Sequence, residues 1–400
     1  MKISKLYIGL LFTSISLSSC SDDESTISIE TPTNYSFSRD GSSTVSFGGQ
    51  TTRIAMAEEL ISALTDETKS KESLLSMFAH EEGDSDFSDA ELNASSKSVR
   101  SKTAASNDFF SNNTTDASAI KTQLDNWIGS QHDEVFPQWE VQAESGTAGQ
   151  IADGESTRYI SANGVEYNQL VGKSLIGALM VDQILNNYLS TAVLDEATNI
   201  EDNDAEVVAD GEIYTTMEHK WDEAYGYLYG ASVDATDPNA TLGDDDSFLN
   251  KYVAKVDANQ YYTGIADDIF DAFKLGRAAI VAKDYTVRDE QAEIIKENLS
   301  KVIAVRAVHY LQAGKDAVAT QNYGGAFHDL SEALGFVYSL QFTRKPNSEA
   351  SYFSKNEVDQ FIEDILAEEN GLWNVSATTL DDISNEIVDA FDLVLAEAVE

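Results

Sequence analysis

Two copies of one short pattern decide the fold of this chain: HKWDEAYGYLY at residues 219–229 and HDLSEALGFVY at residues 328–338. Both fit the pattern H-x-x-x-E-A-x-G-(Y/F)-(L/V)-Y without a gap. Residues four apart lie on the same face of a helix, so each histidine is expected beside its glutamate. The glycine seven residues after the histidine extends that face and lets a neighbouring backbone approach closely. The pattern therefore predicts two helices, each carrying a His–Glu pair.

The other apolar positions give each of these helices a second apolar side. In the first copy this side consists of Trp221, Ala224 and Leu228, and a helix that is apolar on two sides is expected to be buried. A further similarity lies upstream, where the tripeptides NYL and HYL place Tyr188 and Tyr310 ahead of the two motifs. Two helix pairs of similar design indicate a duplicated bundle. Chance similarity of helical patterns is the alternative.

The first 34 residues have the features of an export and anchoring segment. Lys2 and Lys5 precede an apolar run that is too short to span a membrane, so residues 1–19 are predicted to be a signal peptide. The run ends in LSSC, which resembles a bacterial lipobox and implies cleavage before Cys20 and lipidation of its thiol. Residues 20–34 follow as a tether, whose SDDE sequence resembles the signal that Bacteroidota use for surface display. An ordinary solvated linker is the alternative for this tether.

The composition of the chain excludes several classes of function. Its 69 acidic and 26 basic residues give a net charge of −43, so binding to nucleic acid through a basic surface is not expected. Cys20 is the single cysteine, and its lipidation would leave the mature chain without a disulfide or a thiolate metal site. The sequence contains no H-E-x-x-H zinc helix, no G-x-S-x-G nucleophile elbow and no phosphate-binding glycine loop.

Alternating aromatic and polar residues around Asp40-Gly41 predict one small β-hairpin near the N-terminus. The rest of the chain shows helical periodicity and the whole chain has only 4 prolines, which favours long helices. Helices are expected at residues 51–65, 70–78, 117–131, 166–194, 245–255, 262–282, 287–321, 325–342, 355–368 and 379–399. The predicted fold class is all-α, a helical bundle with two related halves in a single domain over residues 35–400. Residues 84–115 have little periodicity and are expected to form an exposed, mobile polar segment.

Three parts of the sequence together resemble a known group of proteins: the lipobox, TVSFGGQTTR at residues 44–53, and MEHKWDEAYGY at residues 217–227. They are similar to an uncharacterised family of Bacteroidota lipoproteins that is associated with imelysins, the iron-regulated helical lipoproteins. Imelysins carry G-x-H-x-x-E on a bundle helix. Here Met217 takes the place of the glycine, His219 matches the histidine, and Asp222 replaces the glutamate. The resemblance implies an imelysin-like bundle of two related helical halves and a part in iron or haem acquisition.

The two His–Glu pairs are the candidate site. If the two halves meet face to face, the pairs would supply imidazole and carboxylate ligands to one metal ion, such as iron or zinc. The predicted ligands are His219, Asp222, Glu223, His328 and Glu332. Haem is a further candidate cofactor. The alternative is that each pair forms a local hydrogen bond or ion pair that orients a buried histidine.

These features predict a lipid-anchored protein of the outer membrane, exposed at the cell surface, that binds a ligand as an accessory of iron or haem acquisition. Its expected contacts are the membrane, through the lipid on Cys20, and an outer-membrane receptor or an imelysin-type lipoprotein. Two other classes stay open. A metal-dependent peptidase or hydrolase would need a metal with an open coordination position. A structural or partner-docking protein would have a filled core between the two motif helices.

Overall fold

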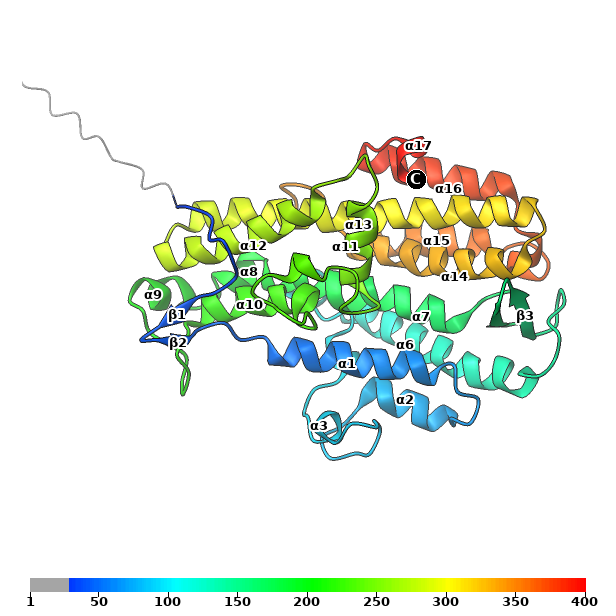
Figure 1. Cartoon of the computed structure of the whole chain (residues 1–400), viewed down its shortest axis with the longest axis horizontal. Helices are drawn as coiled ribbons and strands as arrows, with labels where there is room; N and C mark the ends of the chain where they lie inside the picture. The colour runs from blue at the N-terminus through cyan, green and yellow to red at the C-terminus, as the bar shows by residue number, and fades with distance from the viewer. Residues whose placement is uncertain (1–28) are drawn as a thin grey trace, which may run out of the picture.

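Long helices that run side by side make up most of the fold (Figure 1). The computed structural model describes residues 29–400. The longest helix, α13 (Tyr285–Ala319), packs against both α12 (Ile265–Ala282) and α14 (Tyr323–Ser339). Helix α14 in turn packs against α7 (Tyr167–Leu175). This arrangement confirms the predicted all-α class.

The predicted signal peptide and Cys20 lie outside the described residues. Within residues 29–400, none of the helices combines the length and the apolar character needed to cross a bilayer.

The N-terminal half of the bundle contains α1 (Gly48–Ala63), α6 (Thr114–Ser130) and α10 (Thr216–Tyr229). Two π-helical segments follow α7, namely η3 (Ile176–Val181) and η4 (Ile184–Tyr188). The sequence predicted one uninterrupted helix over residues 166–194, so the π segments and the earlier end are a correction. The remaining helical elements are α2 (Lys71–Ala79), α3 (Ala90–Asn93), α4 (Val99–Lys102), α5 (Asn107–Phe110), η1 (Gln131–Val135), η2 (Phe136–Gln138), α8 (Thr191–Leu194), α9 (Asn199–Asp204), η5 (Pro238–Ala240), α11 (Leu249–Asp257), η6 (Leu340–Phe342), α15 (Lys355–Ile365), η7 (Gly371–Asn374), α16 (Ala377–Phe391) and α17 (Leu395–Ala398).

Both motif helices lie in the core, as their two apolar sides predicted. Trp221 and Leu228 of α10 are fully buried, and so are Leu330 and Val337 of α14. A capping box starts α10 directly before the first motif. The Thr215 side chain accepts a hydrogen bond from the backbone N–H three residues later, and the Glu218 carboxylate accepts one from the Thr215 N–H. Two otherwise unpaired donors of the helix terminus are thereby satisfied.

The predicted N-terminal hairpin is present, with β1 (Ser38–Arg39) paired to β2 (Ser42–Ser43). Its turn residues Asp40 and Gly41 have φ values of 53° and 82°, the left-handed conformations that a tight two-residue hairpin turn requires.

A second hairpin, β3 (Gly149–Asp153) with β4 (Ser156–Ile160), was not predicted. The sequence there appeared irregular because glycines interrupt the alternation. Gly154 supplies a positive φ of 58° at the turn. The hairpin packs on α14, whose Gly324 lies so close that a Cβ there would meet the Ala152 carbonyl oxygen at 2.0 Å.

Residues 84–115 are more structured than the sequence predicted. They contain the three short helices α3, α4 and α5. Phe87, Leu92, Val99, Ala104 and Phe110 are buried in the core. The expectation of an exposed segment is therefore wrong for this part of the chain, because widely spaced apolar side chains anchor it although they show no periodicity.

Candidate functional site

Asp222, one of the predicted metal ligands, is the centre of a buried hydrogen-bond network. Its Oδ1 atom accepts a hydrogen bond of 2.6 Å from the Tyr35 hydroxyl and one of 3.0 Å from Arg277 Nε. Its Oδ2 atom accepts one of 3.2 Å from the Ser46 N–H. Burial raises the pKa of Asp222, and the Arg277 guanidinium acts in the opposite direction. Its carboxylate holds the N-terminal segment against α10 and is not free to bind a metal.

The Arg277 guanidinium, which is fully buried, extends this network to a second carboxylate. Its Nη1 atom lies 3.1 Å from Glu218 Oε1, and Arg39 of the hairpin reaches the same carboxylate through both of its terminal nitrogens. Although burial acts to raise the pKa of Glu218, Arg277 and Arg39 hold it below its usual value. An ion pair thus fastens the hairpin to α10, and the same Glu218 carboxylate binds Arg277 of α12.

The first His–Glu pair lies beside this network, on another face of α10. Glu223 accepts hydrogen bonds of 3.1 Å from Gln50 Nε2 and 3.1 Å from Lys220 Nζ. The His219 Nε2 atom is 3.9 Å from the Glu223 carboxylate, and the His219 ring stacks on Tyr214. Burial acts to raise the pKa of Glu223, but Lys220 and His219 hold it below its usual value.

The second His–Glu pair has a different set of partners. His328 Nδ1 lies 2.9 Å from Glu166 Oε2, and its Nε2 lies 3.6 Å from Glu332 Oε1. The Glu332 carboxylate also contacts Lys173 Nζ at 3.3 Å and accepts a hydrogen bond of 3.3 Å from the Tyr252 hydroxyl. Burial acts to raise the pKa of Glu332, but Lys173 and His328 hold it low.

The two pairs make no contact with each other within residues 29–400, so the described geometry gives no support to the shared metal site that the sequence predicted. Each histidine faces the glutamate of its own helix. No three His, Cys, Asp or Glu side chains within residues 29–400 are arranged to hold a metal ion. Lys220 binds the Glu223 carboxylate, and Lys173 binds the Glu332 carboxylate. The spacing correctly placed each pair on one helix face, but it carries no information about which cations fill the space around that face.

The two pairs do share a structural role. Tyr188, at the end of η4, lies beside Glu223, and Tyr310 of α13 lies beside Glu332. Burial and the neighbouring glutamate raise the pKa of both phenols. The helix that carries the tyrosine packs on the motif helix in each case, η4 on α10 and α13 on α14. The upstream tripeptides NYL and HYL therefore occupy corresponding positions, which supports the predicted duplication.

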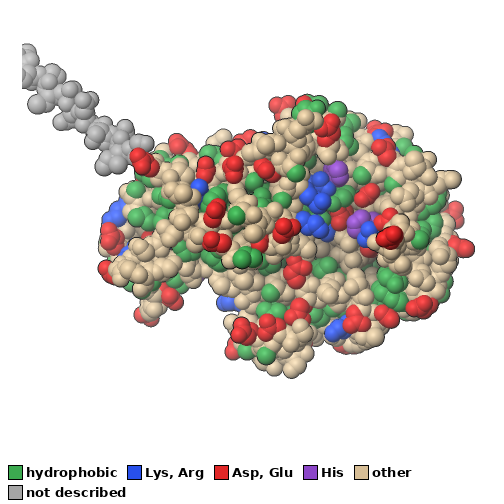
Figure 2. Space-filling view, in the orientation of Figure 1, with side chains coloured by type: hydrophobic (Ala, Val, Ile, Leu, Met, Phe, Trp, Pro, Cys, Tyr) green, Lys and Arg blue, Asp and Glu red, His purple; other side chains and the backbone are tan. Residues whose placement is uncertain are grey.

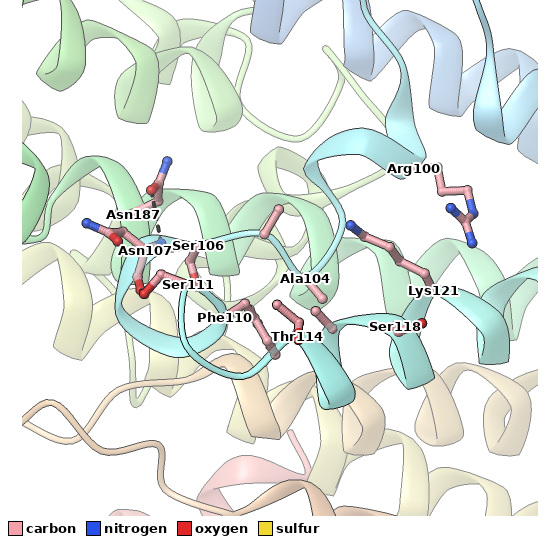
Figure 3. Close-up of a pocket in the computed structure, with 12 residues that line it drawn as sticks. Arg100, Ala104, Ser106, Asn107, Phe110, Ser111, Thr114, Ser118, Lys121 and Asn187 are labelled. Carbon is pink, nitrogen blue, oxygen red and sulfur yellow. Dashed lines mark hydrogen bonds between the residues drawn. The ribbon is translucent and has the colours of Figure 1, made fainter.

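A pocket of about 520 Å³ lies away from both motifs, between α4, α5, the start of α6 and η4 (Figure 3). Arg100 and Lys121 lie at one side of it, and Asn107, Ser111 and Asn187 at the other (Figure 3). Hydroxyl and amide groups dominate the lining, and no carboxylate is part of it. The complete lining is Arg100, Ala104, Ala105, Ser106, Asn107, Phe110, Ser111, Thr114, Ala117, Ser118, Lys121 and Asn187.

The charge of this pocket comes mainly from Lys121. The Nε and Nη2 atoms of Arg100 donate hydrogen bonds to the Asp125 carboxylate, at distances from 2.8 to 3.2 Å. Lys121 has no such ion pair within the described part of the chain. Partial burial lowers the pKa of Lys121, and Arg100 lowers it further. The Asp182 carboxylate acts on the Lys121 pKa in the opposite direction but makes no ion pair with the ammonium group. A partly buried ammonium group without a direct ion pair favours an anionic ligand.

A buried carboxylate fixes the wall of the pocket. Asp182, between the π segments η3 and η4, accepts hydrogen bonds of 3.0 Å from the N–H groups of Ala105 and Ser106. Burial raises the pKa of Asp182 to about 6, and its Oδ1 atom has no partner within the described residues. π-Helical segments are frequent at functional sites. Here the two segments place Asp182 and Asn187 where they hold residues 104–107.

Residues 32–394 match a protein family that is described as a domain of unknown function, DUF4856. The chain belongs to this family. The DUF4856 match includes both motif helices, the buried network around Asp222 and the whole lining of the pocket. No match was found among curated proteins or among solved structures.

The pocket is the part of this DUF4856 protein that sequence reasoning missed. Its residues come from the segment expected to be exposed, from the start of α6 and from a π-helical turn. Two features could have indicated it, namely the Phe109-Phe110 pair in a Ser- and Asn-rich stretch, and Lys121 in a chain with few basic residues.

Proposed function

We propose that this protein is a lipid-anchored binding protein of the outer membrane that takes a small, anionic, oxygen-rich ligand between α4, α5 and α6, as an accessory of iron or haem acquisition. One observation carries the proposal. In a chain with a net charge of −43, this pocket of about 520 Å³ is lined by two basic side chains and no carboxylate. A strongly negative protein repels anions at long range. A local cationic pocket lined by hydrogen-bond donors is therefore the arrangement that an anionic ligand needs.

The lining favours a hydrophilic iron chelate over haem. Phe110 is the one aromatic side chain in the pocket, and Ser106, Ser111, Thr114 and Ser118 contribute hydroxyl groups. The apolar face of a haem would need aromatic or aliphatic walls. A carboxylate-bearing chelate such as ferric citrate offers oxygen atoms that could accept hydrogen bonds from Lys121, the hydroxyls and the side-chain amides.

Lys121→Gln is expected to weaken the binding of ferric citrate by about tenfold or more, because a hydrogen bond to a charged group contributes about 1.5–3 kcal/mol. Isothermal titration calorimetry of the purified protein measures this change. Lys345→Gln removes the same charge from an exposed position outside the pocket and should leave the affinity unchanged. Equal affinity of wild type and Lys121→Gln, or failure of the wild type to bind ferric citrate, contradicts the proposal.

The anchoring part of the proposal rests on the lipobox-like sequence that ends at Cys20. Cys20→Ala is expected to leave the precursor without lipid and to release the protein from the membrane fraction. Mass spectrometry of the N-terminal peptide and fractionation of cells measure the two effects. An unmodified Cys20 thiol in the wild-type protein would refute the anchoring, whatever the pocket binds.

A further inference from the structure

Arg306 of α13 is a buried cation whose hydrogen-bonding groups are not used. Arg306 is 6% exposed, and its Nε atom is buried without a hydrogen-bond partner within the described residues. None of the ion pairs and hydrogen bonds within residues 29–400 includes its guanidinium. The Arg306 Cζ atom lies 4.4 Å from the centre of the Tyr310 ring and 5.6 Å from that of Tyr252. Two aromatic rings thus hold the guanidinium in place, and its buried Nε–H has no acceptor.

Two other buried arginines differ from Arg306, because their guanidinium groups have hydrogen-bond partners. Arg53 is also 6% exposed, yet its Nε donates to the Ser98 carbonyl and its Nη1 to the Gly49 carbonyl. Arg277, which is fully buried, is bound by two carboxylates. A buried donor without a partner costs about 1–3 kcal/mol, and more when it is charged. Such a group is therefore expected to have an acceptor in the functional state.

Further basic side chains lie in the same region of α11 and α13 as Arg306. Burial lowers the pKa of His309 to about 4, and the charges of Arg306 and Lys255 lower it as well. Burial also lowers the pKa of Lys251; Lys173 and Lys255 act in the same direction, whereas Glu332 and Glu58 oppose them. Within the described residues, neither Lys251 nor Lys255 has a carboxylate partner, whereas Lys173 is paired with Glu332. Figure 2 shows Lys and Arg side chains gathered beside two histidines in the middle of this face.

From this arrangement we propose a second binding site, in which Arg306, Lys251 and Lys255 bind an oxyanion, the phosphate or carboxylate group of a ligand. The guanidinium fork matches two oxygens of such a group, and the two lysines add charge around it. Tyr252 and Tyr310 fix the plane of the guanidinium. The site lies on α11 and α13, whereas the pocket that contains Lys121 is formed by α4, α5, α6 and η4. It is independent of the proposed function.

The test is a calorimetric titration of the purified protein with inorganic phosphate and, separately, with acetate, at low ionic strength. Arg306→Lys keeps the charge but loses the fork, and should weaken binding of the preferred anion by about tenfold. Lys251→Gln should weaken it by a few-fold. Lys301→Gln changes a lysine on the same helix that is paired with Glu297, and is expected to bind like the wild type.

The two anions distinguish the source of the ligand, since tighter phosphate binding indicates a phosphate-bearing ligand and tighter acetate binding a carboxylate-bearing one. Thermal melts show whether Arg306→Lys is folded, and Lys251→Gln tests the site if it is not. The inference is overturned if the wild type binds neither anion. It is also overturned if Lys121→Gln, but neither Arg306→Lys nor Lys251→Gln, reduces binding, because the anion would then occupy the other pocket.

Discussion

Arg277→Ala is expected to destabilise the protein by about 3–5 kcal/mol, because it would leave the buried Asp222 carboxylate without a counter-charge and Glu218 with Arg39 alone. Asp222 is fully buried and Glu218 is 1% exposed. Asp222 would keep only the hydrogen bonds from Tyr35 and the Ser46 backbone. Unfolding in urea, followed by circular dichroism, measures the loss.

Arg288→Ala is the matched control for this prediction. The Arg288 side chain is also buried, but its partners Asp195 and Asp289 are 32% and 43% exposed and would be hydrated after the change. A smaller loss of stability is therefore expected. Equal losses for Arg277→Ala and Arg288→Ala would show that the buried network around Asp222 stabilises the fold no more than the partly exposed ion pairs of Arg288 do.

Gly335→Ala is expected to destabilise the protein by about 1–3 kcal/mol through overpacking. A Cβ atom at Gly335 would lie 2.4 Å from Lys173 Cβ, and 2.9 Å from the Leu170 carbonyl oxygen of the facing helix α7. The backbone of α7 would have to move, so the substitution is not relieved by a change of rotamer. Thermal or urea unfolding measures the effect.

The glycine of the first motif should respond in the same direction, because the atoms that it would meet are fixed to the backbone. A Cβ at Gly226 would meet Phe47 Cβ at 2.4 Å and Gln50 Cβ at 3.1 Å, which belong to side chains that precede and start α1. Gly48→Ala provides the control, because nothing lies within 4 Å of a Cβ at that position. It should be neutral or slightly stabilising. Stabilisation by alanine at both Gly226 and Gly335 would contradict the close packing of the two motif helices.

The fold could be predicted because its signals are local. The positions of Ala and Gly in the two motifs identified two buried helices, and the Asp40-Gly41 turn identified the N-terminal hairpin. Local signals failed where tertiary contacts decide the structure. Val99 and Phe110 show no helical period, yet each is buried and anchors a segment that looked exposed.

The candidate site could be predicted only in part, because a motif shows which residues share a face and not what lies opposite. The pairing of His219 with Glu223 followed from their spacing. The capture of Asp222 by Arg277, which lies 55 residues further along the chain, did not. The same limit applies to the pocket, since no motif connects Lys121 with Asn187.

The most direct test of the central claim is a crystal structure of the protein in complex with ferric citrate. We expect the chelate between α4, α5 and α6, with its carboxylates within hydrogen-bond distance of Lys121 and of the hydroxyl groups across the pocket. A chelate bound at Arg306, or an empty pocket at concentrations that saturate the protein in solution, would contradict the assignment of this pocket as the binding site.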